Sequence, residues 1–350
     1  MRREDHGMAF MLQYENVAWY EDGKVRILDR RIYPTKTEFV VCDSHEEVAQ
    51  AIADMVTQSA GPYTAAGMGM ALAAYEARDM AKDKAIEYLE KAAYTLSHAR
   101  PTTVARMEQV TAGCFEAGKA ALEEGKKADE AIFNRTIDSL NRRYSTMSTV
   151  AKYLVDMFPD KGNVMTQCFA ETIVGTMLRE AKARNKDIKL FVPETRPYLQ
   201  GARLTASVGQ GQGFDTTVIT DNMPALTMST KGIDVFTSAA DLILMDGHVV
   251  NKIGTYQIAI AAKYHGVPYF VTGIPDLDHT DVSTVTIEER DPQQVLEARG
   301  VQNTLEGVKG YYPAFDITPP HLVSGVVTDK GIYTPYDLNR YLEGGVKDYY

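Results

Sequence analysis

Residues 241–272, DLILMDGHVVNKIGTYQIAIAAKYHGVPYFVT, contain the pattern that decides the fold class. Two apolar runs, Asp241–Met245 and Pro268–Thr272, have the length of buried strands, and Lys252–His265 between them has the length and apolar spacing of a helix. A strand, a helix and a strand in this order are typical of a right-handed βαβ unit in a parallel sheet.

Three more apolar runs of strand length precede this unit: Asn163–Thr166, Ile188–Val192 and Thr216–Thr220. The stretches between the runs have helical length, as in Ala170–Ala183. We therefore expect an α/β fold over residues 146–350, a Rossmann-like domain with a doubly wound parallel sheet. Ligands of such sheets bind at the carboxyl ends of the strands, so we search there for a site.

The preceding residues, 1–145, predict a small N-terminal domain of strands and helices. Three short runs separated by turn residues predict strands at Ala9–Tyr14, Val17–Tyr20 and Val25–Asp29. Amphipathic or Ala-rich stretches predict helices at His45–Ser59 after a cap at Ser44, Gly61–Ala81, Lys82–Leu96, Thr102–Glu124 and Ala128–Asn141.

Composition excludes several classes of function. The chain has 350 residues, 45% of them hydrophobic and 24% charged, as in a globular protein with room for two domains. A net charge of −10 without a basic stripe argues against nucleic acid as a partner. A small phosphorylated ligand remains possible, because its site needs only one or two local cations and backbone N–H groups.

The cysteines and histidines predict a metal-free protein of the reducing cytoplasm. Cys42, Cys114 and Cys168 are far apart and show no CxxC spacing, and the seven histidines are scattered. The first ten residues lack the apolar core of a signal peptide, and no run of about 18 apolar residues predicts a membrane span.

Cys168 lies just after the first predicted strand of the parallel sheet. A thiol between a strand end and a helix start can have a lowered pKa and act in catalysis. A buried cysteine that acts as a small hydrophobic residue fits the position equally well.

Asp241 and Lys252 are two further candidate site residues. Between Ala240 and Leu242, the Asp241 carboxylate should be partly desolvated, which would raise its pKa and suit a general acid. Its spacing alone favours an Asp that caps a turn. Residues 251–255, NKIGT, read as a helix start whose N–H groups and Lys252 could bind an anion.

Two loops carry arginines. Residues 194–203, ETRPYLQGAR, place Arg196, Gln200 and Arg203 around turn residues, where they could bind a polyhydroxylated phosphate. Arg100 precedes a proline that can start a helix. Exposed loops and solvated turns often have the same composition.

Several of these motifs together resemble the S-methyl-5-thioribose-1-phosphate isomerase family. Its superfamily also holds ribose-1,5-bisphosphate isomerase and the regulatory subunits of translation initiation factor 2B. The motifs that carry the resemblance are Leu28–Arg31, Ala99–Thr102, Glu194–Pro197, Gln200–Thr205, Thr220–Met223, Ala240–Asp241, Asn251–Thr255, Ile287–Arg290 and Pro313–Pro320.

The resemblance implies a catalytic cysteine at Cys168 and a catalytic aspartate at Asp241. It further implies a homodimer that needs no organic cofactor and whose partner is a small sugar phosphate. The residues it implies for substrate binding are Arg100, Gln200, Asn251 and Lys252, with the backbone at Gly61.

The chain departs from the family pattern beside these residues. The family loop Arg-Gly-Ala-Pro reads Ser59-Ala60-Gly61-Pro62 here. The neighbours of the cysteine are Gln167, Phe169 and Glu171, where the family has His, Asn and Gly, and His248 stands where Asp is common. By the resemblance these positions face the substrate pocket, so the identity of the sugar phosphate stays open.

The expected reaction is the isomerisation of an aldose 1-phosphate to a ketose 1-phosphate. Methylthioribose 1-phosphate or 5-deoxyribose 1-phosphate is the expected substrate, with Asp241 as acid and Cys168 as the group that moves a proton. Two alternatives stay open, a ribose-1,5-bisphosphate isomerase and a non-catalytic regulatory subunit that senses sugar phosphates.

Overall fold

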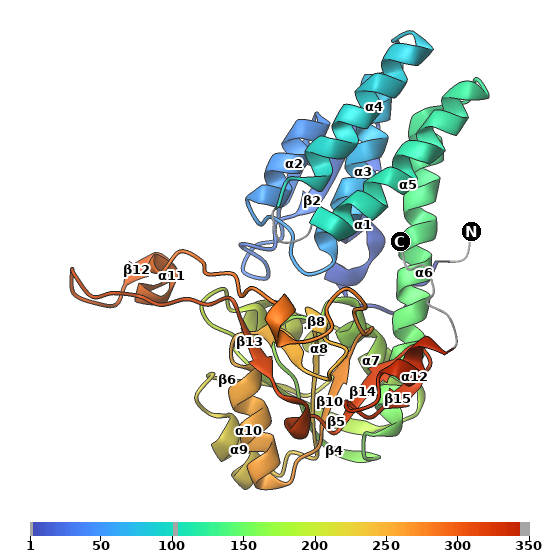
Figure 1. Cartoon of the computed structure of the whole chain (residues 1–350). Coiled ribbons are helices and arrows are strands. Elements are labelled where there is room, and N and C mark those ends of the chain that lie inside the picture. Colours follow the sequence, from blue (N-terminus) through green and yellow to red (C-terminus); the bar gives the residue numbers. More distant parts are fainter. Residues whose placement is uncertain (1–2, 101–103, 344–350) are drawn as a thin grey trace. The chain divides into compact units, whose positions relative to one another are not determined.

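The computed structural model describes residues 3–100 and 104–343, and Figure 1 shows their elements in chain order. The chain divides into two compact units, of which the first ends at Thr146 and the second begins at Met147. The first unit starts with the short helices η1 (Phe10–Leu12) and α1 (Tyr14–Val17). An antiparallel sheet in the order β1-β2-β3 follows, formed by Ala18–Glu21, Lys24–Leu28 and Phe39–Cys42.

The helices after β3 build most of this unit. They are α2 (His45–Ala53), α3 (Gly61–Glu76), α4 (Lys82–Ser97), α5 (Val104–Glu123) and α6 (Ala128–Asp156). Helix α3 contacts α2, α4, α5, β1 and β2. Its glycines permit this, because a Cβ on Gly67 would lie 2.7 Å from Thr136 and a Cβ on Gly69 would lie 3.0 Å from Leu96. The small residues of this segment therefore allow close packing of the helix.

The strand predicted at Ala9–Tyr14 is wrong. Met11 and Leu12 are consecutive and both fully buried, which an alternating strand with one solvent face cannot provide. The Asp5 carboxylate accepts a hydrogen bond from the Tyr14 N–H at 2.8 Å, where α1 begins. The chain therefore enters the sheet through helical turns, and the third strand is β3, which the sequence pattern did not predict.

Helix α6 is twice as long as expected. The prediction ended at Asn141, before two arginines, but α6 continues to Asp156 and passes the unit boundary. Tyr144, Val150 and Leu154 keep the apolar spacing of a helix and are fully buried. Two other helices are shorter than expected, since α2 ends at Ala53 and α3 at Glu76.

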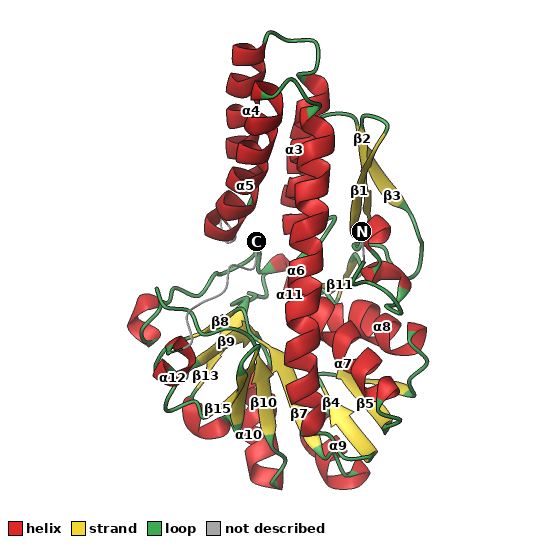
Figure 2. Ribbon diagram, turned by 90° about the vertical axis from the view of Figure 1, so that its right-hand side faces the viewer, coloured by secondary structure: helices red, strands yellow, loops and turns green. Residues whose placement is uncertain are grey.

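The second unit is built on the expected sheet, which Figure 2 shows in yellow. The strands are β4 (Lys161–Met165), β5 (Asp187–Pro193), β6 (Thr216–Ile219), β7 (Val235–Ala239), β10 (Tyr269–Thr272), β14 (Gly325–Thr328) and β15 (Gly331–Tyr333). Their order is β15-β14-β10-β7-β4-β5-β6, and every pair is parallel except β14 with β15. The prediction of an α/β fold with a doubly wound parallel sheet is confirmed.

The helices of this unit connect the parallel strands. They are α7 (Thr172–Ala183), the π-helix η3 (Gly201–Thr205), α8 (Ala206–Gly211), α9 (Pro224–Lys231) and α10 (Thr255–His265). Helices α7 and α8 contact each other and the strands β5 and β6, whereas α9 packs on α10, which contacts β7 and β10. The remaining short helices are η4 (Val282–Thr284), α11 (Gln293–Leu296), η5 (Pro320–Leu322) and α12 (Asn339–Leu342).

The run Asp241–Met245 is not a strand of the large sheet, contrary to expectation. The strand of the large sheet in this part of the chain is β7. Its polar residues Thr237 and Ser238 are buried, and their hydroxyls form hydrogen bonds with the Phe270 carbonyl and the Tyr269 hydroxyl. Within the run, β8 (Leu242–Ile243) joins a separate antiparallel sheet of the order β13-β9-β8, with β9 (Val249–Lys252) and β13 (Phe315–Thr318).

A two-stranded hairpin of β11 (Glu297–Ala298) and β12 (Val301–Gln302) completes the strands. Among the described residues, no helix has the length and apolar character that crossing a membrane requires.

Candidate functional site

The candidate catalytic residues follow three neighbouring strands of the parallel sheet. Cys168 lies after β4, Thr195 after β5 and Asp241 after β7, and these strands adjoin in the order β7-β4-β5. The loops after parallel strands meet at one edge of the sheet, which is where such folds bind ligands.

Cys168 is held on both sides by hydroxyl groups. Its backbone N–H donates to Thr195 Oγ1 at 3.2 Å, and the Thr205 hydroxyl donates to its carbonyl oxygen. Burial raises the pKa of the Cys168 thiol to about 11, while the Lys252 ammonium opposes the rise and the charge of Asp241 adds to it. The expectation of a pKa lowered by a helix start is wrong, because α7 begins four residues later at Thr172.

The backbone is strained in the loop after β4, which holds Cys168, and in the loop after β5. Cys168, Glu171, Thr195 and Leu199 have φ angles of 58°, 42°, 62° and 57°. Positive φ is unusual for residues other than glycine, above all for the β-branched Thr195. Asp221 holds the Thr195 turn, since its carboxylate accepts the N–H groups of Thr195 and Arg196 at 2.8 and 2.7 Å. Strain that neighbouring bonds maintain is a frequent property of functional sites.

Lys252 ends strand β9 and is 6% exposed. Its Nζ lies 4.1 Å from the centre of the Phe315 ring, a cation–π distance. Burial lowers the pKa of Lys252, while Cys168 and Asp241 raise it. The thiol, the carboxylate and the ammonium thus interact electrostatically within one region.

At the start of helix α10, two backbone N–H groups are bonded to a side chain of the chain itself. The carboxylate of Asp316, on β13, accepts hydrogen bonds from Gly254 at 2.7 Å and Tyr256 at 3.1 Å. Burial raises the pKa of Asp316 to about 6 in spite of these bonds. Lys252 lies before the helix, whose first residue is Thr255.

Asp241 is an exposed residue of the loop between β7 and β8. Its backbone N–H donates to the Val250 carbonyl at 2.9 Å, which ties it to strand β9. The expected desolvation of its carboxylate is therefore absent in this structure. Asp241 still acts on the pKa values of both Cys168 and Lys252.

Asn251 and Gln200 are both 6% exposed. Asn251 Nδ2 donates to the Thr255 hydroxyl at 3.0 Å, and this hydroxyl donates to the Lys252 carbonyl at 2.8 Å. Gln200 directly precedes the π-helix η3, and its Oε1 has no hydrogen-bond partner among the described residues. A buried, unsatisfied acceptor at a strand-end loop is suited to a ligand hydroxyl.

The two arginines of the 194–203 loop form hydrogen bonds with backbone carbonyls and so stabilise the fold. Arg196 donates to the carbonyl oxygens of Gln294 and Glu297, and Arg203 donates to that of Tyr198. Their bonds to backbone differ from the ligand contacts that the composition of this loop suggested.

Arg290 enters the site although sequence reasoning gave it no role. Its guanidinium donates to the Glu288 carboxylate at 2.9 and 3.2 Å and lies 5.7 Å from the Phe315 ring centre. Its charge acts on Cys168 and Lys252. The motif Ile287–Arg290 pointed to this segment, but no spacing rule connects it to Phe315.

Gly61 and Arg100 belong to the N-terminal unit. Gly61 is the first residue of α3, and Arg100 is a half-buried residue that follows α4. Residues 101–103, which include the expected helix start after Arg100, lie outside the described residues.

The positions that depart from the family pattern have different environments. Gln167 donates to the Ile253 carbonyl at 3.2 Å, Phe169 is buried and Glu171 is fully buried. Ser59 is exposed before α3, and His248 is half-buried in the turn between β8 and β9.

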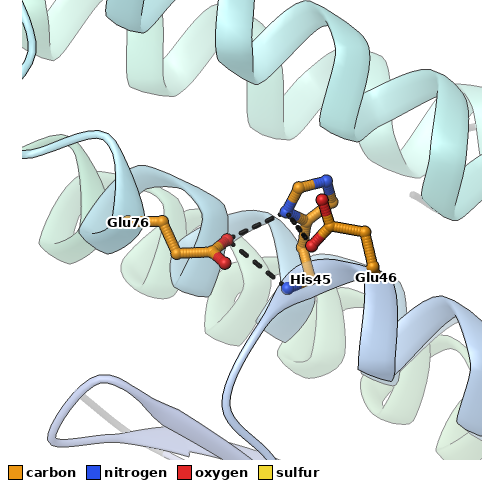
Figure 3. Close-up of side chains that lie close together, drawn as sticks. All are labelled: His45, Glu46 and Glu76. Atoms are coloured by element: carbon orange, nitrogen blue, oxygen red, sulfur yellow. Dashed lines mark hydrogen bonds and ion pairs between the residues drawn. The ribbon is translucent and has the colours of Figure 1, made fainter.

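Among the described residues, one group could hold a metal ion: His45, Glu46 and Glu76, drawn in Figure 3. His45 Nδ1 lies 2.9 Å from a Glu76 oxygen and 3.2 Å from a Glu46 oxygen. Glu76 also accepts the backbone N–H of His45 at the start of α2. These contacts hold His45 at the first turn of α2, whose cap is Ser44, and so give the cluster a structural explanation.

Comparison with known proteins gives one consistent family. A model of the initiation factor 2 subunit family matches residues 58–335. A methylthioribose-1-phosphate isomerase from Chloroflexus aurantiacus is 35% identical over 93% of this chain and 98% of its own length.

Solved structures similar to this chain belong to the same group of proteins. The 5-methylthioribose 1-phosphate isomerase of Pyrococcus horikoshii has a TM-score of 0.84 and 29% identity, over 94% of this chain and 96% of that one. The delta subunit of translation initiation factor eIF-2B from A. fulgidus has a TM-score of 0.80 and 30% identity, over 91% and 96% of the two chains.

Proposed function

The chain belongs to the initiation factor 2 subunit family, and from this premise we propose that it is an aldose–ketose isomerase acting on S-methyl-5-thioribose 1-phosphate. The product is the corresponding ribulose 1-phosphate. The observation that carries the proposal is the placement of Cys168 after β4, Asp241 after β7 and Lys252 at the end of β9, where the charges of Asp241 and Lys252 act on the Cys168 thiol.

The substrate explains the need for an acid. Phosphate on O1 prevents the spontaneous ring opening of an ordinary sugar. Asp241 donates a proton to the ring oxygen as the bond from this oxygen to C1 breaks. In the proton-transfer route, Cys168 then removes the C2 proton to give an enol phosphate and returns a proton to C1, while the Asp241 carboxylate accepts the proton of O2 and so regains the proton it gave to the ring oxygen. In the competing route, hydrogen moves from C2 to C1 as hydride.

Lys252 supports the proton-transfer route. Burial keeps the Cys168 thiol protonated, so the thiol must lose its proton before it can act as a base. The Lys252 ammonium opposes the rise in the pKa of this thiol, so its charge favours the loss of the thiol proton. The same ammonium would bind the substrate phosphate.

The remaining binding residues follow the family pattern. Arg100 and the backbone at Gly61 would join Lys252 at the phosphate, and Gln200 and Asn251 would bind hydroxyls. The unsatisfied Oε1 of buried Gln200 supports its role. A homodimer in the reducing cytoplasm is part of the proposal, in keeping with three free cysteines, and sedimentation of the purified chain tests the dimer.

Of two other sugar phosphates, ribose 1,5-bisphosphate is the weaker candidate. Ribose 1,5-bisphosphate would need a second cationic cluster, and Arg196 and Arg203 are bonded to backbone carbonyls. The buried Phe169 next to Cys168 suits an apolar 5-substituent, as in 5-deoxyribose 1-phosphate or its methylthio relative. The likeness to an eIF-2B subunit favours, as the second candidate function, a regulatory protein without turnover.

Phosphorus NMR of the full chain with a panel of pentose 1-phosphates tests the proposal. We expect turnover of the methylthio sugar, abolished in Cys168→Ser and Asp241→Asn while substrate binding persists. Near-normal turnover in either variant would overturn the residue assignment. No turnover of any sugar phosphate by the wild type would favour the regulatory alternative. Deuterium at C2 that is fully retained at C1 would select the hydride route.

A further inference from the structure

Gln167 connects two segments of the candidate site, the thiol loop (166–171) and the ammonium turn (252–254). It directly precedes the candidate catalytic cysteine, and it is 2% exposed. Its Nε2 donates a hydrogen bond to the carbonyl oxygen of Ile253 at 3.2 Å. Ile253 directly follows Lys252, the last residue of β9. One buried side chain therefore joins the neighbours of the thiol and of the ammonium.

The other side of the ammonium turn is bonded to the segment of strand β13. The Ile253 N–H donates to the Ala314 carbonyl at 3.1 Å, and the Gly254 N–H donates to the Asp316 carboxylate at 2.7 Å. Gln167 binds the C=O of Ile253, so this residue is held through its N–H on one side and through its C=O on the other. Loss of the Gln167 amide would keep the bonds to the β13 segment and remove the bond to the thiol loop.

The Gln167 amide is also packed closely against the backbone of this turn. Gly254 has a φ of 103°, and a Cβ there would lie only 3.1 Å from Gln167 Nε2. A carbonyl oxygen accepts a hydrogen bond only from a donor, so the amide must turn its NH₂ group and not Oε1 toward Ile253. The bond and the contact together fix the side chain in one orientation.

Stability alone does not account for a glutamine at this position. The Oε1 of Gln167 is buried and accepts no hydrogen bond from the described residues. A buried acceptor without a donor costs about as much stability as one neutral hydrogen bond contributes, so the amide adds little on balance. An apolar side chain of similar size would avoid this cost and would lose the connection to Ile253. The connection is what the glutamine provides and an apolar residue does not.

The two connected segments carry groups that interact electrostatically. The positive charge of Lys252 opposes the rise in the pKa of the Cys168 thiol, and Cys168 in turn raises the pKa of Lys252. Interactions between charges weaken as their separation grows. A bond that sets the position of the ammonium turn relative to the thiol loop therefore also sets the strength of this interaction.

We infer that Gln167 is a positioning residue of the candidate active site, which holds Lys252 at a fixed place relative to Cys168 through its hydrogen bond to the Ile253 carbonyl. For catalysis the inference rests on the proposed isomerase reaction, in which Lys252 binds the phosphate on O1 and Cys168 takes the proton from C2. A fixed spacing of these two residues then places C2 of the bound sugar against the thiol.

A double-mutant cycle on the alkylation of Cys168 tests the positioning without any substrate. The rate is measured in the full chain at one pH for the wild type, Gln167→Met, Lys252→Met and the variant with both changes. Gln167→Met should slow alkylation about two- to tenfold more in the wild-type background than in Lys252→Met, because only the former has a cation to misplace. A change in the access of the reagent to the thiol affects both backgrounds alike and cancels in the comparison.

Steady-state kinetics with the methylthio sugar phosphate test the effect on the reaction. Gln167→Met should lower kcat about ten- to hundredfold with a smaller change in KM, because the phosphate contact remains while C2 is misplaced. Gln167→His retains a ring N–H donor and should recover part of the lost kcat.

Gln212, directly after α8, provides a matched control. It is 7% exposed, its Nε2 donates to the Gly175 carbonyl at 3.0 Å, and its Oε1 has no partner within the described part of the chain. Gln212→Met thus removes the same type of bond outside both segments, and it should keep the wild-type kcat and alkylation rate. Circular dichroism of each variant establishes folding.

Equal slowing of alkylation by Gln167→Met in both backgrounds, or wild-type kcat in folded Gln167→Met, would overturn the inference. An equal loss of kcat in Gln212→Met would also overturn it, since the effect would then be that of any buried glutamine. A wild type that turns over no sugar phosphate but shows the alkylation cycle would keep the positioning of Lys252 and reject the isomerase. Turnover by the wild type without the cycle would keep the isomerase and reject the role of Gln167.

Discussion

The carboxylate of Asp316 closes the start of helix α10 by accepting the Gly254 N–H at 2.7 Å. Asp316 lies on β13 opposite Asn251 of β9, so one carboxylate connects the strand that carries Lys252 to the helix that follows it. The other oxygen of this carboxylate is buried and accepts no hydrogen bond from the described residues. Two of our predictions concern this corner of the molecule.

Asp316→Asn should change the pH dependence of stability. Burial raises the pKa of Asp316 from its ordinary 3.8 to about 6, so the folded state binds the proton more tightly than the unfolded state. The resulting stabilisation is complete below about pH 4 and is lost as pH rises through about 6. Urea unfolding between pH 4 and 7 should show this loss in the wild type and not in Asp316→Asn, and parallel curves would contradict it.

Phe315→Leu should weaken the placement of the Lys252 ammonium. A cation–π contact contributes about 0.5–2 kcal/mol, so we expect KM for the sugar phosphate to rise up to about thirtyfold, with a smaller effect on kcat. Phe315→Tyr keeps the ring and is the control. An unchanged KM in Phe315→Leu would show that the ring does not hold Lys252 in the catalytic state.

Alkylation of Cys168 should be slow at neutral pH and speed up as pH rises toward 11, because burial raises the pKa of this thiol to about 11. Lys252→Met removes an opposing cation, so alkylation should be slower still at each pH. Peptide-resolved mass spectrometry separates Cys168 from the buried Cys42 and Cys114. Fast labelling of Cys168 at pH 7 would contradict the raised pKa.

Thr195→Val should lower turnover without abolishing folding. The change removes the oxygen that accepts the Cys168 N–H, and an unpaired buried N–H costs about 1–3 kcal/mol of stability. Thr195→Ser retains the hydroxyl and serves as its control. Circular dichroism establishes folding, and kcat equal to the wild type in folded Thr195→Val would remove Thr195 from the positioning of Cys168.

The sequence pattern predicts β4, β5, β6 and β10 of the parallel sheet. It fails at β7, because Thr237 and Ser238 are polar yet buried, and their hydroxyls find partners only across the sheet. It fails at α6 for the same reason, since Arg143 looks like a solvent-facing residue and is in fact buried. The hydropathy of a segment does not show that its polar side chains are buried and hydrogen-bonded to residues far away in the sequence.

The candidate site shows the same limit. The position of Cys168 after a strand follows from the sequence, and so does the loop that holds Gln200. The approach of Phe315 and Arg290 to Lys252 depends on the pairing of β9 with β13, across more than 60 residues of chain. Nothing in the local spacing encodes that pairing, and only the folded chain reveals it.

The positive φ angles of Cys168, Glu171 and Thr195 have a consequence for attempts to engineer this protein. Replacing Cys168 or Glu171 with glycine relieves a local conformational penalty, and a screen for heat resistance would reward that relief. The same replacements would loosen the thiol and its supporting loop. Selection for robustness alone would therefore enrich inactive proteins, so a library at these positions must be sorted by turnover first.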